Sequence, residues 1–456
     1  MTIPYFWSRS GQNTFPIQQV PLRITLSVMA LLWGGASQAQ ELVSVAGDGS
    51  QGNSFSQEAS ISDDGRYVAF QSSASNFALG DVAPTASFGV ADSDIFVVDT
   101  QTGAIELISA DPMGLPVNGS SDAEISADGR YVVFVSRASN LVANDTNEQS
   151  DVFFFDRETR IVQRVNLGPG GAQADGQSDG VAISADGTTV AFESTAANLV
   201  AGDTNSRRDI FVWRRDSGLI QRVSAAANGD EADNSSDQPT LSGNGQFVAF
   251  ESNATNLVAG DTNERRDIFL VNLGANTIER VNLRPDGGET DANSEHPSIS
   301  DDGRIIAFES RATNLTDDVL NGTNNIFVKD RVSGEVSLVS RSTSGISADA
   351  FCEWPSVSPD GQLVVFDCPA NSLVSTDTGG VESVFLHDRT AGTTSLISTG
   401  VQDPSGNQGS NRPSMGRDAV AFASRATNLV VDDTNDAEDI FVVRFTVFSN
   451  GFESTQ

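Results

Sequence analysis

The alternation of apolar and polar positions repeats along most of the chain. In a typical copy, an apolar residue, a serine and an Asp-Gly turn precede an apolar run, as in residues 125–134. The first apolar residues of the copies are spaced 64 residues once and then 58 residues five times, and they are Ile61, Ile125, Ile183, Leu241, Ile299, Val357 and Met415. Seven copies at such a period predict a propeller, a solenoid or a similar array.

Each copy contains segments that predict four strands. Glycine tolerates the positive φ of a tight turn, so the Asp-Gly or Asn-Gly turn is expected to pair a short segment such as 297–300 with the apolar run after it. A polar stretch then leads to a third segment, such as 267–271, and a second turn leads to a fourth, such as 336–339. We therefore expect a four-stranded antiparallel meander in every copy.

Seven such meanders predict an all-β fold. The continuous valine, isoleucine and phenylalanine runs are typical of strands buried on both faces, and no sustained helical period occurs after residue 40. Four-stranded sheets packed around an axis bury both faces, which predicts a seven-bladed β-propeller. An open solenoid is the alternative, but it needs atypical capping repeats.

The two ends of the repeat array predict how the ring closes. The last copy has a third strand at residues 439–443 but no fourth, whereas Glu41-Leu42-Val43-Ser44 nearly repeats Glu106-Leu107-Ile108-Ser109. We expect the N-terminal strand to complete the last blade. Joining both ends of the array in one sheet removes the edges that an open stack would expose.

These motifs resemble the TolB-type, WD40-like propeller repeat family. The residues concerned are Ile-Ser-x-Asp-Gly, the phenylalanine after it and a third strand of the form Asp-Ile-Phe-Val, as at Asp439-Ile440-Phe441-Val442. The resemblance covers essentially all of residues 40–447 and implies an exported propeller. The chain departs from TolB itself in having seven copies rather than six and no room for the additional α/β domain.

The first 39 residues differ from the rest and predict a signal peptide. They contain no acidic residue, carry Arg9 and Arg23, and run apolar from Ile24 to Trp33 before small residues that end at Ala39. A retained membrane anchor is the alternative, although the run is short for a span. We expect residues 1–39 to be removed, residues 40–447 to form the propeller and residues 448–456 to be a tail, in a periplasmic or secreted protein.

Charge limits the class of partner. The chain has 27 basic and 61 acidic residues, and without Arg9 and Arg23 the balance is 25 − 61 = −36. Such a field repels nucleic acid and anionic lipid. Acidic connections such as residues 229–234 and 288–293 should meet on one face around the axis. We expect a monomer whose acidic face binds an envelope or extracellular protein or a small ligand, with no nucleic-acid partner.

Four loops with the pattern Asp-Thr-Asn-x-x-x-Asp are candidate calcium sites, because carboxylate and amide oxygens are calcium ligands. The alternative is that these side chains fold back on the local backbone as Asx turns. The pattern lacks the sixth-position glycine and twelfth-position glutamate of an EF-hand loop. The candidate ligands are Asp145, Asn147, Asp151, Asp203, Asn205, Asp209, Asp261, Asn263, Asp267, Asp433, Asn435 and Asp439.

The two cysteines, Cys352 and Cys368, are symmetric about Asp360 in the turn Pro359-Asp360-Gly361. Strands paired across that turn would place them opposite each other at a separation that a disulfide accepts. We predict a structural disulfide, as an exported chain permits. A free pair and metal ligation are the alternatives.

Little in the sequence predicts catalysis. After residue 39 the histidines are His296 and His387, and lone histidines are more often structural than catalytic. We place His296 just before a first strand near the axis and His387 at the end of a third strand near the outside. The function predicted is a non-catalytic binding scaffold. A lyase or glycoside hydrolase that uses carboxylates in the channel is the alternative, and a pair with strongly raised pKa values would favour it.

Overall fold

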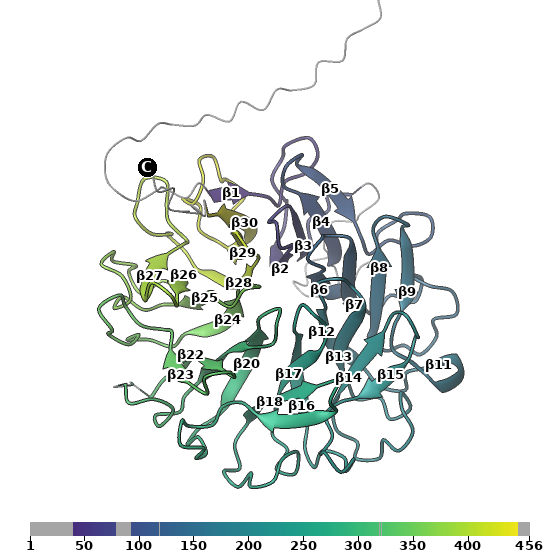
Figure 1. Cartoon of the computed structure of the whole chain (residues 1–456). Coiled ribbons are helices and arrows are strands. Elements are labelled where there is room, and N and C mark those ends of the chain that lie inside the picture. Colours follow the sequence, from purple (N-terminus) through teal and green to yellow (C-terminus); the bar gives the residue numbers. More distant parts are fainter. Residues whose placement is uncertain (1–39, 79–92, 118, 319, 321, 446–456) are drawn as a thin grey trace, which may run out of the picture. The chain divides into compact units, whose positions relative to one another are not determined.

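The computed structural model describes residues 40–78, 93–117, 119–318, 320 and 322–445, and all of them belong to one unit of the chain, residues 38–456. Their strands form seven four-stranded antiparallel sheets in a ring, which confirms the seven-bladed propeller (Figure 1). The predicted signal peptide and the predicted tail, residues 448–456, lie outside the described residues.

The first four blades follow the chain from the inside of the ring outward. Blade 1 has β2 (Ser56–Ile61), β3 (Tyr67–Ser72), β4 (Asp94–Asp99) and β5 (Ala104–Leu107). Blade 2 has β6 (Ser120–Ile125), β7 (Tyr131–Ser136), β8 (Asp151–Asp156) and β9 (Ile161–Arg164). Blade 3 has β12 (Ser178–Ile183), β13 (Thr189–Ser194), β14 (Asp209–Arg214) and β15 (Ile220–Arg222). Blade 4 has β16 (Ser236–Leu241), β17 (Phe247–Ser252), β18 (Asp267–Asn272) and β19 (Thr277–Arg280).

The remaining blades repeat this order. Blade 5 has β20 (Ser294–Ile299), β21 (Ile305–Ser310), β22 (Asn325–Asp330) and β23 (Val336–Leu338). Blade 6 has β24 (Glu353–Val357), β25 (Leu363–Cys368), β26 (Ser383–Asp388) and β27 (Thr393–Leu396). Blade 7 has β28 (Ser410–Met415), β29 (Ala419–Ser424), β30 (Asp439–Arg444) and β1 (Gln40–Leu42). The connection between blades 2 and 3 adds β10 (Leu167–Gly168), a 3-10 turn (Pro169–Gly171) and β11 (Ala172–Gln173).

The N-terminal strand closes the ring as predicted. Strand β1 pairs antiparallel with β30, with Leu42 opposite Phe441, and the two ends of the array lie side by side in Figure 1. The backbone N–H of Val43 extends the ladder by donating to Ile440 O at 2.9 Å. Blade 7 therefore has the same four strands as its neighbours, although one comes from the other end of the chain.

A pair of phenylalanines forms the centre of each blade. In blade 2, Phe134 of β7 lies opposite Phe153 of β8, both side chains are buried, and their ring centroids are 5.6 Å apart. The other pairs are Phe70–Phe96, Phe192–Phe211, Phe250–Phe269, Phe308–Phe327, Phe366–Phe385 and Phe422–Phe441. All six residues of β7 are buried, so its continuous apolar run is explained by packing on both faces.

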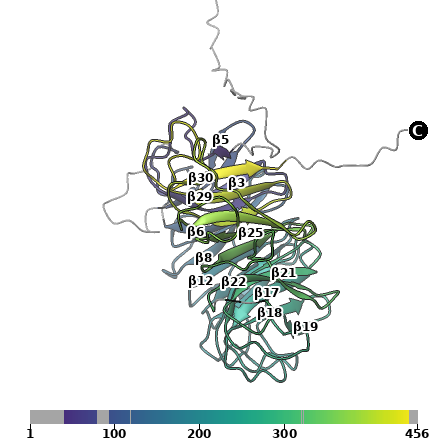
Figure 2. The same ribbon diagram turned by 90° about the vertical axis from the view of Figure 1, so that its left-hand side faces the viewer.

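Backbone hydrogen bonds join the turns between first and second strands at one end of the axis. Each turn donates an N–H to a carbonyl of the next blade, until the proline of blade 6, which has no N–H, interrupts the circle. The bonds are Asp63 to Ala127 (3.0 Å), Ala127 to Ala185 (3.1 Å), Ala185 to Gly243 (3.0 Å), Asn244 to Asp301 (3.0 Å), Asp301 to Pro359 (2.9 Å) and Arg417 to Asp63 (2.9 Å). These bonds draw the blades together at that end, and the blades are seen edge-on in Figure 2.

The structure contains the predicted disulfide. Cys352 is bonded to Cys368, with the Cα atoms 4.3 Å apart, and both residues are buried. In the other blades this position carries two hydrogen-bonded serines, such as Ser236 and Ser252 with hydroxyl oxygens 2.9 Å apart. The disulfide thus replaces a side-chain hydrogen bond that recurs around the ring.

Candidate binding pocket on the propeller axis

The first strand of each blade begins earlier than the sequence predicted, and the added residues surround the axis. A β-bulge interrupts each of these strands where it pairs with the second, and at the bulge one residue per blade has positive φ. These seven residues, here called the axial ring, are Glu58, Asp122, Gly180, Gln238, His296, Trp354 and Arg412, with φ between 46° and 53°. They line a cavity of about 490 Å³.

Buried carboxylates of the preceding blade hold the axial ring backbone in four of the seven blades. The N–H of Gln238 donates to Glu193 Oε2 at 2.8 Å, and the N–H of His296 donates to Glu251 Oε2 at 2.9 Å. The same contact joins Trp354 to Glu309 at 3.3 Å and Arg412 to Asp367 at 2.8 Å. These acceptors fix the left-handed backbone, which is otherwise unfavourable for residues with a side chain.

One side of the axial ring is filled by stacked side chains, here called the stacked arc: His296, Trp354 and Arg412. The rings of His296 and Trp354 are 3.9 Å apart, and the guanidinium of Arg412 lies 4.6 Å from the centre of the Trp354 ring. Arg412 also forms an ion pair with Glu58 of blade 1. The tryptophan ring is thus in contact with a histidine and an arginine from its two neighbouring blades.

His296 is held by the layer behind the axial ring. Its Nδ1 atom lies 3.1 Å from Oε1 of Glu309, whose side chain is 2% exposed. Burial is the largest influence and would lower the pKa of His296, but the contact with Glu309 and the negative charges of Glu309, Glu251 and Glu295 together outweigh it, so the pKa is raised. The sequence placed His296 just before a strand. It lies instead inside β20, because the bulge extends the strand past the predicted start.

The other side of the cavity, here called the open arc, contains Asp122, Gly180 and Gln238 of the axial ring together with Glu124, two residues after Asp122. Burial, together with Glu58 and Asp179, raises the pKa of Asp122 to about 6. Burial raises the pKa of Glu124 to about 7, although the hydroxyl of Ser60 donates to its Oε2 at 2.7 Å. A Cβ at Gly180 would lie 2.9 Å from the carboxyl carbon of Glu193, so only glycine fits there without a shift.

His387, the second histidine, is far from this pocket in the fold. It is buried on β26, where Nδ1 lies 2.9 Å from the hydroxyl of Thr394 on β27. Burial, with a contribution from Arg341, lowers its pKa to about 4. The structure therefore does not bring the two histidines together, as the sequence predicted.

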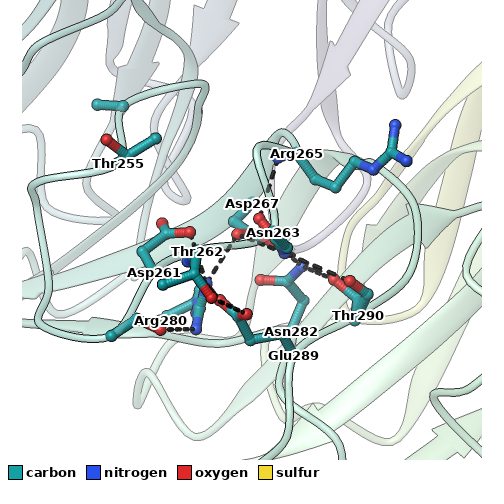
Figure 3. Close-up of polar contacts among 12 residues, drawn as sticks. Thr255, Asp261, Thr262, Asn263, Arg265, Asp267, Arg280, Asn282, Glu289 and Thr290 are labelled. Carbon is teal, nitrogen blue, oxygen red and sulfur yellow. Dashed lines mark hydrogen bonds and ion pairs between the residues drawn. The ribbon is translucent and has the colours of Figure 1, made fainter.

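Three of the four candidate calcium loops contain an arginine from the fourth strand. In blade 4, Arg280 Nη1 lies 2.9 Å from Asp261 Oδ1, 3.1 Å from Asp267 Oδ2 and 3.0 Å from Glu289 Oε1 (Figure 3). Arg164 lies in the same way beside Asp145 (2.8 Å) and Asp151 (3.1 Å), and Arg222 beside Asp203 (3.3 Å) and Asp209 (3.8 Å). The guanidinium occupies the space between the two carboxylates.

The asparagines of these loops make the local contacts of the turn alternative. Asn205 Oδ1 accepts the N–H of Arg207 at 2.9 Å, and Asn263 Oδ1 accepts that of Arg265 at 3.0 Å. Their amide groups also donate to the last aspartate, as Asn205 does to Asp209 at 3.1 Å. These contacts explain the Asp-x-Asn-x-x-x-Asp spacing without a metal in blades 3 and 4.

The loop of blade 7 has the same residues but no arginine. Its fourth strand is β1, where Leu42 lies opposite Phe441, the register position that Arg280 occupies opposite Phe269 in blade 4. Asp433 Oδ1 is buried without a hydrogen-bond partner. Burial, together with Asp433, raises the pKa of Asp439 to about 6 despite donors from Ser44 at 2.6 Å and Asn435 at 2.8 Å.

Within residues 40–445, apart from the gaps given above, no group of three or more histidine, cysteine, aspartate and glutamate side chains is arranged to hold a metal. The same part of the chain has no helix long and apolar enough to cross a membrane.

Solved structures share the fold. The β-propeller domain of the Trilobed protease from Pyrococcus furiosus is 12% identical, with a TM-score of 0.54, covering 88% of this chain and 98% of that one. An oligogalacturonate lyase in complex with manganese is 13% identical, with a TM-score of 0.53, covering 90% of this chain and 95% of that one.

TolB from Acinetobacter baumannii is also similar, at 14% identity and a TM-score of 0.40, covering 67% of this chain. The chain spans 60% of that protein. No family model and no curated protein matches the sequence. The propellers with TM-scores above 0.5 and the seven closed sheets together identify the fold of this chain as a β-propeller.

Proposed function

We propose that this chain is an exported, non-catalytic binding module that takes its ligand in the axial pocket. The observation behind the proposal is that the axial ring residue is different in every blade. Neighbouring positions of the repeat are nearly constant, such as the apolar landmark and the serines, whereas the axial ring has seven different residues in seven blades. A position that only shaped the bulge would be best served by glycine, which occurs once.

The cost of these side chains supports the same proposal. A left-handed conformation costs a residue with a Cβ roughly 1–2 kcal/mol relative to glycine. Six blades carry this cost and present a different chemical group to the cavity. Conformationally unfavourable residues that persist in a fold are concentrated at binding and catalytic sites.

The surroundings of the pocket favour a soluble partner outside the cytoplasm. The disulfide is typical of an exported protein. The acidic connections between blades, such as residues 229–234 and 288–293, lie on the face where the first strands begin. This face is the predicted contact surface for an envelope or extracellular protein that presents the ligand group.

A pocket-filling variant tests the proposal. Gln238→Trp places a tryptophan where blade 6 already has Trp354 with nearly the same φ, so the fold accommodates it. Ligand-observed NMR with mixtures of amines, sugars, amino acids and organic acids should find a compound that binds the wild-type protein but not Gln238→Trp. The control is Gln163→Trp on the exposed edge strand β9, which should still bind. The proposal is wrong if every compound that binds the wild-type protein binds Gln238→Trp and Gln163→Trp equally well.

Catalysis by the open arc is a second candidate, and the raised pKa values of Asp122 and Glu124 favour it. A carboxyl group with a pKa of about 7 can donate or accept a proton at neutral pH, as glycosidases and lyases require. Product formation from acidic and neutral oligosaccharides, lost in Glu124→Gln, would establish it. If neither class of substrate is cleaved, the binding module stands.

We also propose that blade 7 is the blade in which calcium stabilises the loop. Arginine supplies positive charge to the other three loops of the pattern, and Leu42 leaves Asp433 and Asp439 without it. Asp433, Asn435 and Asp439 supply the oxygen ligands that calcium prefers. The effect expected is stabilisation of the seam between the two ends of the array.

A further inference from the structure

We infer that the ligand group of the axial pocket is a cationic amine, bound between the carboxylates of Asp122 and Glu124 in the open arc. The inference rests on the proposed function and specifies its ligand. It covers both a free diamine and a lysine side chain of a partner protein, since the recognising chemistry is the same.

The carboxylates of the open arc lack the close arginine that two of the carboxylates behind the axial ring have. Behind the axial ring, Glu193 lies 3.1 Å from Arg208 Nη1, and Glu251 lies 2.8 Å from Arg266 Nη1. Among the described residues, neither Asp122 nor Glu124 forms an ion pair. Glu124 accepts a hydrogen bond from Ser60, and Asp122 accepts one from the backbone of Gly180. Two carboxylates in a cavity without a counter-ion favour a cationic ligand.

The cavity has room at this point. Gly180 presents no side chain between Asp122 and Gln238, and these residues, with Glu124, line the same cavity of about 490 Å³. Arg412, whose charge also acts on Asp122, is already paired with Glu58 and stacked on Trp354. The cationic group of the pocket is therefore engaged, and the acidic groups are the ones available to a ligand.

The stacked arc argues against ligands that bind by aromatic stacking. Sugars and aromatic compounds commonly use the face of a tryptophan, but His296 and Arg412 already stack on the ring of Trp354. A ligand that stacked there would have to displace one of them. Charge complementarity in the open arc requires no such rearrangement.

The test is a calorimetric titration with three probes. They are 1,4-diaminobutane as the free amine, acetyl-Gly-Lys-Gly-amide as the lysine side chain, and 1,4-butanediol as the uncharged match of the diamine. We expect at least one amine to bind with a dissociation constant on the order of 0.1 mM and the diol at least tenfold more weakly, about 1.4 kcal/mol. Preference for the tripeptide indicates a protein partner, and preference for the diamine indicates a small molecule.

Isosteric variants locate the site. Asp122→Asn and Glu124→Gln should each weaken amine binding at least tenfold, and the glutamine can still accept the Ser60 hydroxyl. The control is Asp216→Asn, which removes the same charge at an exposed position in the turn between β14 and β15 and should change affinity less than twofold. Thermal melting by circular dichroism verifies that each variant folds.

Two results separate failure of this inference from failure of the proposed function. The amine assignment is wrong if the diol binds as well as the diamine, if neither amine binds, or if both isosteric variants bind amines normally. The proposed function survives those results if another compound from the NMR mixtures is excluded by Gln238→Trp. Both fail if no compound distinguishes Gln238→Trp from Gln163→Trp.

Discussion

At the scale of single residues, the side chains of the axial ring lower the stability of the fold and present different chemical groups to the cavity. The left-handed backbone of the ring is part of the repeat, because every blade has the bulge and a positive φ at that point. The repeat does not require a side chain at this position, because blade 3 has the same backbone conformation with Gly180. The ring residues thus carry a conformational cost that the fold itself does not require.

We therefore expect Gln238→Gly to stabilise the protein by up to about 1 kcal/mol, since glycine removes the left-handed cost but makes the unfolded chain more flexible. The measurement is urea unfolding followed by circular dichroism. A control at Gln163, which lies in a regular edge strand, should instead lose stability on the same substitution. Loss of stability at Gln238 would show that its side chain contributes to the fold.

The open arc also predicts a pH dependence of amine binding. The pKa values of about 6 for Asp122 and about 7 for Glu124 mean that both groups are largely protonated at pH 5 and ionised at pH 8. The charged groups near Asp122 are Glu58, Asp179 and Arg412, and Glu124 faces Ser60, Asp122 and Glu58. The amine stays charged throughout, so its affinity should rise from pH 5 to pH 8.

Calorimetry in two buffers with different ionisation enthalpies checks this dependence, because binding at pH 6.5 should release protons. In Glu124→Gln the step near pH 7 should disappear while the step near pH 6 remains. Affinity that is constant with pH would show that these carboxylates do not face the ligand.

At the scale of elements, the fourth strand of each blade determines whether the acidic loop beside it has a cation. Arg164, Arg222 and Arg280 lie 13 residues after the last aspartate of their loops, at the same register opposite a core phenylalanine. In blade 4 the arginine and both aspartates are buried, with side chains 6%, 2% and 1% exposed. Removing one partner of a buried ion pair strongly destabilises a protein, because the other charge stays buried without compensation.

We expect Arg280→Leu to destabilise the protein by about 3 kcal/mol, because Asp261 and Asp267 would stay buried without a cation. The matched control is Arg265→Leu in the same loop, whose side chain is exposed and points away from the carboxylates (Figure 3). Chemical denaturation of both variants gives the comparison. A cost below about 1 kcal/mol for Arg280→Leu would show that the loop carboxylates are solvated.

The converse substitution in blade 7 is Leu42→Arg, which supplies the missing guanidinium. In the wild-type protein, about 1 mM calcium should raise the melting temperature by mass action. The variant should melt at a higher temperature without calcium and should not respond to it. If calcium leaves the wild-type melting temperature unchanged, the metal proposal for Asp433, Asn435 and Asp439 is wrong.

At the scale of the whole molecule, the periodic part of the fold could be predicted and the exceptions to the period could not. The spacing of the apolar landmarks gave seven blades, and the likeness of residues 41–44 to residues 106–109 gave the closing strand. Reading strands from alternation missed the bulges, because the period-two pattern ends at the bulge and so placed His296 outside β20.

Two signals of the site were nonetheless present in the sequence. The axial ring lies three residues before each apolar landmark, the position at which the copies differ most. The arginines of the fourth strands recur at the repeat period, at positions 164, 222 and 280. What could not be predicted is the pairing across blades, such as Arg412 with Glu58, since it depends on closure of the ring.

The central claim is that a cationic ligand binds on the propeller axis at Asp122 and Glu124 of blade 2. A crystal structure of the protein grown with 1,4-diaminobutane at pH 8 tests it most directly. We expect one amine nitrogen within about 3 Å of carboxylate oxygens of both Asp122 and Glu124, the length of a charge-assisted hydrogen bond. A diamine bound only at the outer loops, with the open arc holding water alone, would contradict the claim.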